Sequence, residues 1–431
     1  MSENIHQQLK EAANFLGEYA ATLMAVGAQT SRIEYNTIRI ASELGFKVNM
    51  LIFPRTISIM LQDKDSEHSY SYICHTPKLA LNFRTNMQLS RLSWDAYDNH
   101  LSLDEIRKRF DEVVTYPRES PWTVLILVSF ANACFCRLFD GNYTSMLIVF
   151  IATFIGFYIR QQLTRRGMSA LSVFVICSFI STMIGACDYL FIHGGTEDMS
   201  LGTSMLYLVP GVPLINGVMD IIDHHVLNGS ARLVNACMLI ICIALGLSIT
   251  LLITQVNPLV YTKVVRPDIL GASIQDGLYA GVAGLGFAVI SNPPRKAFAI
   301  CFLLACIGHG IRYFLMHYNL LMLDQAMAST LAGLAIGLLA VVFARRIHCP
   351  AESFAFPSLL PMVPGMFAYK AVRDVINIVQ VKGSESINYV DRFFYNSTLT
   401  VLVMVGMVIG CVLPIFIFYR QSFSVTRFKK F

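Results

Sequence analysis

The chain has 431 residues, of which 55% are hydrophobic and only 14% are charged. An ordinary soluble domain carries about 25% charged residues, so this composition excludes a wholly soluble protein. The formal net charge of +5 is modest and argues against a nucleic-acid partner.

Charged residues are frequent at the start of the chain and retreat to short gaps from Trp122 onward. This shift predicts a soluble cytosolic α/β domain over 1–118, followed by two membrane segments over 119–256 and 257–431. The first twenty residues contain charges and no apolar core, so we expect no cleaved signal peptide. We expect no cofactor and no metal, because most cysteines lie in apolar runs and no CxxC pair occurs.

The first domain has mixed secondary-structure signals. Apolar residues at helical spacing predict two helices between 4 and 45, separated near Gly27. Ser102 and Glu105 have the spacing of a capping box, which predicts a helix that reaches Val114. Three runs rich in β-branched and apolar residues predict strands: 47–53, 56–62 and 69–75.

Arg32 and Glu34 lie on the second predicted helix of this domain. They are either a functional charge pair or part of a solvated helix face. No P-loop, GxSxG, HExxH or GxGxxG motif occurs in the domain, so the sequence predicts no catalytic site and no enzyme there.

Ten apolar runs approach the roughly 20 residues that a helix needs to cross a bilayer. They are 122–139, 144–160, 169–192, 200–226, 230–254, 269–290, 297–317, 325–344, 353–377 and 397–419. Lys and Arg gather on alternate loops, which favours cytoplasmic N- and C-termini. Two segments disobey this rule, one with Lys263 and Arg266 and one from Lys370 to Arg392.

Two of the runs contain a Val-Pro-Gly break. LVPGVPLINGVMD covers 208–220, and MVPGMFAYKAVRD covers 362–374, with an Asp ten residues after the first Pro of each. IGFYIR at 155–160 resembles IGHGIR at 307–312 at nearly the same offset. These matches predict two repeats of five spans. An odd number of spans forces the second repeat to insert upside down, as in secondary transporters.

A proline break in a membrane helix frees backbone groups that protein or water must satisfy. The half-helix after the break presents N–H groups and a positive dipole end, which suit a carboxylate. We therefore predict a substrate site at Pro210, Gly211, Asn216, Pro364 and Gly365. A structural kink without ligand contact is the alternative.

Ionisable residues within membrane spans are costly and therefore indicate function. A proton-coupled carrier needs such groups, and the candidates are Asp220, Asp276, His309, Arg312 and Asp374. The equal spacing from the two prolines suggests that Asp220 and Asp374 are functionally paired. Arg160 corresponds to Arg312 in the repeat, and we expect it to follow the positive-inside rule.

The chain resembles the threonine/serine exporter family over nearly its whole length. GAQTSRIEYNTIRIASELG at 27–45 and PGVPLINGVMDIIDHHVLNGSAR at 210–232 match motifs of the N-terminal half. The later segments NPPRKAF (292–298), GHGIR (308–312) and PSLLPMVPGMFAYKAVRD (357–374) are similar to a smaller component that some bacteria encode separately. The chain therefore resembles a fusion of two components. Gln29 departs from the first motif.

The resemblance implies proton-driven export of threonine and serine, or of dicarboxylates such as succinate, across a bacterial inner membrane. The implied partners are the substrate, protons and the lipid bilayer, and a homo-oligomer stays open. Two rivals remain: a passive facilitator or channel of the same fold, and a membrane-bound enzyme or sensor. The matching family positions are Arg32, Glu34, Pro210, Gly211, Pro213, Asn216, Asp220, Asn292, Pro293, Arg312, Pro364, Gly365 and Asp374.

Overall fold

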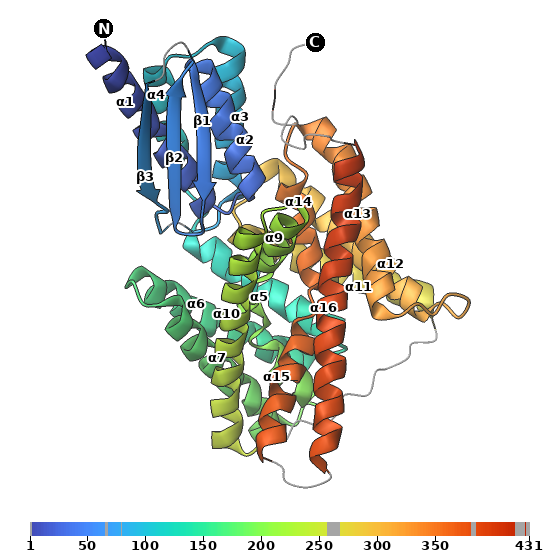
Figure 1. Ribbon diagram of the computed structural model, residues 1–431. Helices are drawn as coiled ribbons and strands as arrows, with labels where there is room; N and C mark the ends of the chain where they lie inside the picture. The colour runs from blue at the N-terminus through green and yellow to red at the C-terminus, as the bar shows by residue number, and fades with distance from the viewer. Residues whose placement is uncertain are drawn as a thin grey trace.

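The computed structural model describes residues 2–64, 68–78, 80–256, 268–380, 385–418 and 427. Lys263, Arg266 and the predicted boundary at residue 257 lie outside these residues. Helices dominate the described chain, and one small sheet lies near the N-terminus (Figure 1).

The N-terminal part combines a three-stranded antiparallel sheet, in the order β1-β2-β3, with four helices (Figure 1). Its elements are α1 (Ser2–Ala25), α2 (Thr30–Glu43), β1 (Phe46–Ile52), β2 (Thr56–Asp63), β3 (Ser69–His75), α3 (Phe83–Asn99) and α4 (Leu103–Val114). Alternate residues Ile57, Ile59 and Leu61 of β2 are fully buried and share a core with α1. The three predicted strands and the capping box at Ser102 are confirmed.

Eight helices in the described part of the chain are long and apolar enough to cross a membrane. They are α5 (Pro121–Leu138), α6 (Tyr143–Arg165), α7 (Ala170–Cys187), α10 (Val226–Thr254), α11 (Ile269–Ile290), α12 (Phe298–His317), α13 (Gln325–Ile347) and α16 (Glu385–Phe418). Short turns of helix extend two of them: η1 (Asp188–Ile192) follows α7, and η3 (Arg295–Ala297) precedes α12. The chain is a multi-pass membrane protein.

The two remaining predicted spans are broken. The first consists of α8 (Glu197–Thr203), η2 (Leu206–Leu208) and α9 (Gly211–Ile222), and the helix axis bends by 59° between its two arms. The second consists of α14 (Glu352–Leu359), η4 (Leu360–Met362) and α15 (Gly365–Gln380). With the first pair counted as one span, at most nine of the ten predicted spans in the described residues are long and apolar enough to cross a membrane. The second pair is not among them, and its second arm, α15, carries Lys370, Arg373 and Asp374.

Both breaks have the same backbone pattern. The Gly211 N–H bonds the carbonyl of Val209 at 2.9 Å, and the Gly365 N–H bonds that of Val363 at 2.8 Å. The next helical bonds restart from the proline carbonyls, at 3.1 Å in each case. Each proline therefore ends one helix and begins another, because it cannot donate the bond that would continue the first.

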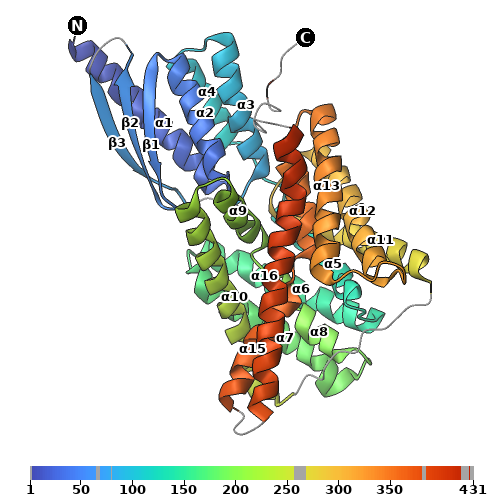
Figure 2. The same cartoon turned by 45° about the vertical axis from the view of Figure 1, so that its right-hand side comes forward.

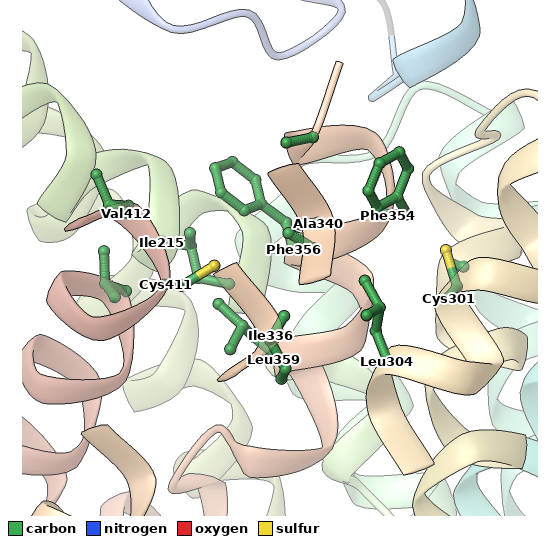
Figure 3. Packing of buried hydrophobic residues seen from close by; sticks show 14 of the residues in the cluster. Ile215, Cys301, Leu304, Ile336, Ala340, Phe354, Phe356, Leu359, Cys411 and Val412 are labelled. Carbon is green, nitrogen blue, oxygen red and sulfur yellow. The ribbon is translucent and has the colours of Figure 1, made fainter. Parts of the chain in front are cut away.

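The broken helices occupy different ends of the helical region. Both views place α9 beside the N-terminal part and α15 at the far end (Figures 1 and 2). The short helix α14 lies beside α9, near the N-terminal part (Figure 1), and its residues Phe354, Phe356 and Leu359 pack with Leu304 of α12 and Ile336 of α13 (Figure 3). This packing fixes the position of the second break.

Candidate functional site

The two Val-Pro-Gly breaks contact each other. A Cβ added to Gly365 would lie 3.3 Å from side-chain atoms of both Leu206 and Val209 at the first break. A Cβ added to Gly211 would meet the side chain of Leu360 at the second break. Glycine at both positions thus lets two segments about 150 residues apart in sequence approach closely.

A cavity of about 740 Å³ opens where the breaks meet, and we call it the central cavity. Its walls come from both breaks, from α1 and the loops of the N-terminal part, and from α5, α6, α7, α10 and α11. Four of the five predicted substrate residues, Pro210, Gly211, Asn216 and Gly365, line it, whereas Pro364 does not.

The charged residues in this lining are all arginines among the described residues: Arg55, Arg160 and Arg232. Arg55 lies in the loop between β1 and β2, and Arg160 lies near the end of α6. Arg232 already pairs with Asp220 at 3.3 Å and donates to the carbonyl of Ala28 at 2.8 Å. The central cavity therefore has a cationic lining, which suits an anion.

Asp220 ties α9 to the N-terminal part. Its carboxylate accepts hydrogen bonds from the backbone N–H of Thr30 at 3.0 Å and from the Thr30 hydroxyl at 3.2 Å. Asn216, one turn earlier, donates to the carbonyl of Gly27 at 3.1 Å. The motif that begins at residue 27 therefore docks against the first broken helix.

Asp374, the counterpart of Asp220, has quite different neighbours. It is fully buried and accepts a hydrogen bond from Asn396 of α16 at 3.0 Å, beside an ion pair with Arg373 at 3.4 Å. Asp220 is thus held by the N-terminal part and by Arg232, whereas Asp374 is held within the second half, and these contacts do not join the two carboxylates.

Asp276, His309 and Arg312 form a buried chain of polar contacts. Asp276 Oδ2 lies 2.6 Å from His309 Nδ1, and His309 Nε2 lies 3.0 Å from an Arg312 nitrogen. Because a guanidinium only donates, Nε2 must accept, so the imidazole is neutral with its proton on Nδ1. Arg312 also reaches the Met362 carbonyl at 3.5 Å, directly before the second break. None of these three residues is part of the lining of the central cavity.

Arg32 and Glu34 have separate roles in the structure. Arg32 is 3% exposed and pairs with Glu352 of α14 at 3.0 Å, so it is not on a solvated face. Glu34 is 43% exposed in its side chain and lies 3.9 Å from His225. Asn292 donates to Asn82 at 2.9 Å, which adds a further contact between the N-terminal part and the helical region.

Three functional candidates escaped the sequence reasoning. Glu352 could not be recognised from the sequence because its partner Arg32 lies 320 positions away. Arg232 was not considered, although its partner Asp220 is close in sequence, and Arg160 was explained by the positive charge expected on a cytoplasmic loop. A signal for Arg232 existed, because it closes the family-like segment 210–232. The alignment of 155–160 with 307–312 was the signal for Arg160.

Comparison with known proteins covers most of the chain. A family model described as "Putative threonine/serine exporter" matches residues 14–254, and one described as "Threonine/Serine exporter, ThrE" matches 276–417. The "Probable succinate transporter subunit YjjP" of Klebsiella aerogenes is 29% identical over 230 residues, which cover 53% of this chain and 88% of that protein.

Two further relatives match the chain over shorter stretches. The Escherichia coli protein of the same description is 34% identical over 151 residues, or 34% of this chain and 58% of that protein. An uncharacterized Haemophilus influenzae protein is 31% identical over 149 residues, or 35% of this chain and 48% of its own length. No solved structure matches. The chain belongs to the threonine/serine exporter family and holds segments that match both of its family models.

Proposed function

We propose that this chain is a secondary transporter that exports a small carboxylate-bearing metabolite by proton antiport. The observation that carries the proposal is the central cavity, in which two Val-Pro-Gly breaks meet beside a cationic lining. Its volume of about 740 Å³ lies within the range typical of small-molecule sites. Guanidinium groups and the first turn of a half-helix both bind carboxylates.

The helical region supports an alternating-access mechanism. We infer two five-span repeats, α5–α10 and α11–α16, each with three long helices, one broken span and a final long helix. The positions of α9 and α15 at opposite ends favour repeats of inverted topology. In such proteins the substrate site lies at the interface of the repeats, and one repeat rocks against the other around it.

Proton coupling falls to the buried chain of Asp276, His309 and Arg312. A proton added to His309 converts Nε2 from an acceptor into a donor, which breaks its bond with Arg312. Arg312 is the link to the Met362 carbonyl at the second break. Proton uptake would thereby change the support of the broken helix that faces the central cavity.

The lining of the central cavity favours a dicarboxylate over a zwitterion. A serine or threonine would bring an ammonium group, yet the lining offers no carboxylate among the described residues. A dianion such as succinate places two negative charges among arginines. Threonine and serine are retained as second candidates because the family models bear their names.

We further propose a bacterial inner-membrane location with both termini in the cytoplasm. Arg55 and Thr76, in loops of the N-terminal part, contribute to the lining. With that part in the cytoplasm, the central cavity opens on the side from which an exporter loads its substrate. The positive-inside charges of the loops support the same orientation.

The decisive experiment is counterflow with the purified full chain in proteoliposomes. We expect trans-stimulated uptake of labelled succinate, a weaker response to serine and threonine, and stimulation by a pH gradient. Transport that ignores the gradient would support the passive facilitator instead. If no carboxylate is exchanged under any gradient, the chain is not the exporter proposed, and the enzyme or sensor alternative gains weight.

A further inference from the structure

Arg160 is the one arginine of the central cavity that sits on a membrane-spanning helix and has no acidic partner among the described residues. Its guanidinium carbon lies 5.1 Å from the centre of the Phe174 ring and 5.5 Å from that of Phe157. Aromatic faces attract a cation, but they do not accept its N–H groups as a carboxylate does. Arg160 thus retains donors for a ligand.

The repeat shows why this arginine is unpaired. In the segment 307–312, His309 provides the lone pair that holds Arg312. In the matching segment 155–160, Phe157 stands at the histidine position. The first half therefore keeps the arginine and replaces its protein acceptor with an aromatic ring. An unpaired charge in a membrane span is costly, so a ligand that supplies the missing anion would be strongly favoured.

A second donor group faces the same space. Gly211 and Val212 line the central cavity and form the first turn of α9, a helix of 12 residues. The Gly211 N–H already bonds the Val209 carbonyl and Pro213 has no N–H, so the Val212 N–H is the donor of this turn that has no acceptor among the described residues. Tyr207 lines the cavity as well, and its hydroxyl lies 2.9 Å from that of Ser181. The site thus combines a guanidinium, a helix start and aromatic walls.

We propose that Arg160 is the anchor for a carboxylate of the transported substrate, with the first turn of α9 as the second donor to the same group. The inference rests on the proposed function and adds the residue that selects for a carboxylate. Arg232 is the weaker of the two anchors, because Asp220 already neutralises part of its charge, and it takes the second carboxylate. A small dicarboxylate then spans the central cavity between two arginines, whereas a monocarboxylate uses Arg160 alone.

The test measures succinate binding and succinate transport by the full chain. We expect Arg160→Gln to raise both the Kd and the KM about tenfold or more, since a hydrogen bond to a charged group is lost. Arg160→Lys should recover part of the loss, because lysine keeps the charge but not the forked donors. Arg165→Gln, at the exposed end of the same helix, is the matched control and should bind like the wild type.

The outcomes separate the anchor from the wider proposal. If the wild type transports succinate and Arg160→Gln binds it with unchanged Kd, the anchor is wrong while the transporter stands. A lower melting temperature with unchanged Kd would assign Arg160 a structural role and also overturn the anchor. If Arg160→Gln does not fold, Arg160→Lys decides the matter through its Kd.

Two other results would also decide against the anchor. An anionic lipid headgroup could occupy the same donors, so binding of phosphatidylglycerol is measured in parallel in detergent. If Arg160→Gln abolishes lipid binding and leaves succinate binding intact, the occupant is the lipid. If the wild type itself transports no carboxylate, the proposed function fails and the anchor fails with it.

Discussion

The two halves of the helical region share a scaffold and differ at their polar sites. Both breaks show the same hydrogen bonds around Val-Pro-Gly. Yet Arg160 faces aromatic rings in the first half, while Arg312 is engaged by His309 in the second. We infer that the two arginines of the proposed repeat have diverged, and that Arg160 serves substrate binding while Arg312 serves proton coupling.

The N-terminal part contacts both broken spans, each through a different half. Thr30 contacts Asp220 of α9, which follows the first break, and Arg32 contacts Glu352 of α14, which precedes the second break. Under the proposed inverted repeat, equivalent half-helices would lie at opposite ends of the helical region. The N-terminal part therefore makes the two broken spans unequal.

His309→Phe should have the largest effect, because it gives the second half the residue found in the first. Asp276 and Arg312 would both lose their shared partner. We expect export driven by a pH gradient to fall about 100-fold, the lower end of what a positioned proton-transfer group contributes. Counterflow without a gradient should persist. Gradient-driven transport at the wild-type rate would show that the two arginine sites do not differ in this role.

Close helix contacts at two glycines test whether the two halves of the helical region pack in the same way. A Cβ at Gly246 would meet the backbone of α7 near Val175, and a Cβ at Gly337 would meet the backbone of α16 at Cys411. Gly246→Ala and Gly337→Ala should each destabilise the protein by roughly 1–3 kcal/mol, the usual cost of overpacking. Melting temperatures of the purified variants measure this, with the exposed Leu338→Ala as control. A large effect at one glycine alone would argue against equivalent packing.

Phe157→His is the reverse exchange and should have a smaller effect than His309→Phe. It offers Arg160 a lone pair, which competes with the substrate for the guanidinium. We expect the Kd for succinate to rise about tenfold, in line with one hydrogen bond to a charged group. Phe157→Leu removes the ring without adding an acceptor and should bind more tightly than the histidine variant. Equal affinities for the two variants would contradict competition for Arg160.

The sequence predicted the local features well, because they depend on neighbouring residues. The strands, the capping box at Ser102 and both breaks follow from apolar pattern, side-chain capping and proline chemistry. The partners of the ionisable residues could not be predicted in this way. Arg32 and Glu352 are separated by 320 positions, and their contact exists only once the N-terminal part docks on α14. The role proposed for Arg160 could be recognised only from the cavity, because its position near the end of a span is equally consistent with the positive-inside rule.

The smallest predicted effect separates Asp220 from Asp374. Asp220→Asn keeps an oxygen for the Thr30 N–H but loses the charge that strengthens this bond and the pair with Arg232. We expect the docking contact to weaken by about 1 kcal/mol. Asp374→Asn should leave it unchanged, since that carboxylate bonds Asn396 and Arg373.

Hydrogen exchange at the Thr30 amide measures this difference directly, because that N–H is bonded to Asp220. Exchange should accelerate roughly fivefold in Asp220→Asn, as about 1 kcal/mol implies, and stay at the wild-type rate in Asp374→Asn. If both variants accelerate it equally, the two acids are coupled across the breaks, and the functional pairing suggested by their equal spacing would be correct. If only Asp220→Asn does so, the duplicated acids have separate duties, with Asp220 holding the N-terminal part over the central cavity.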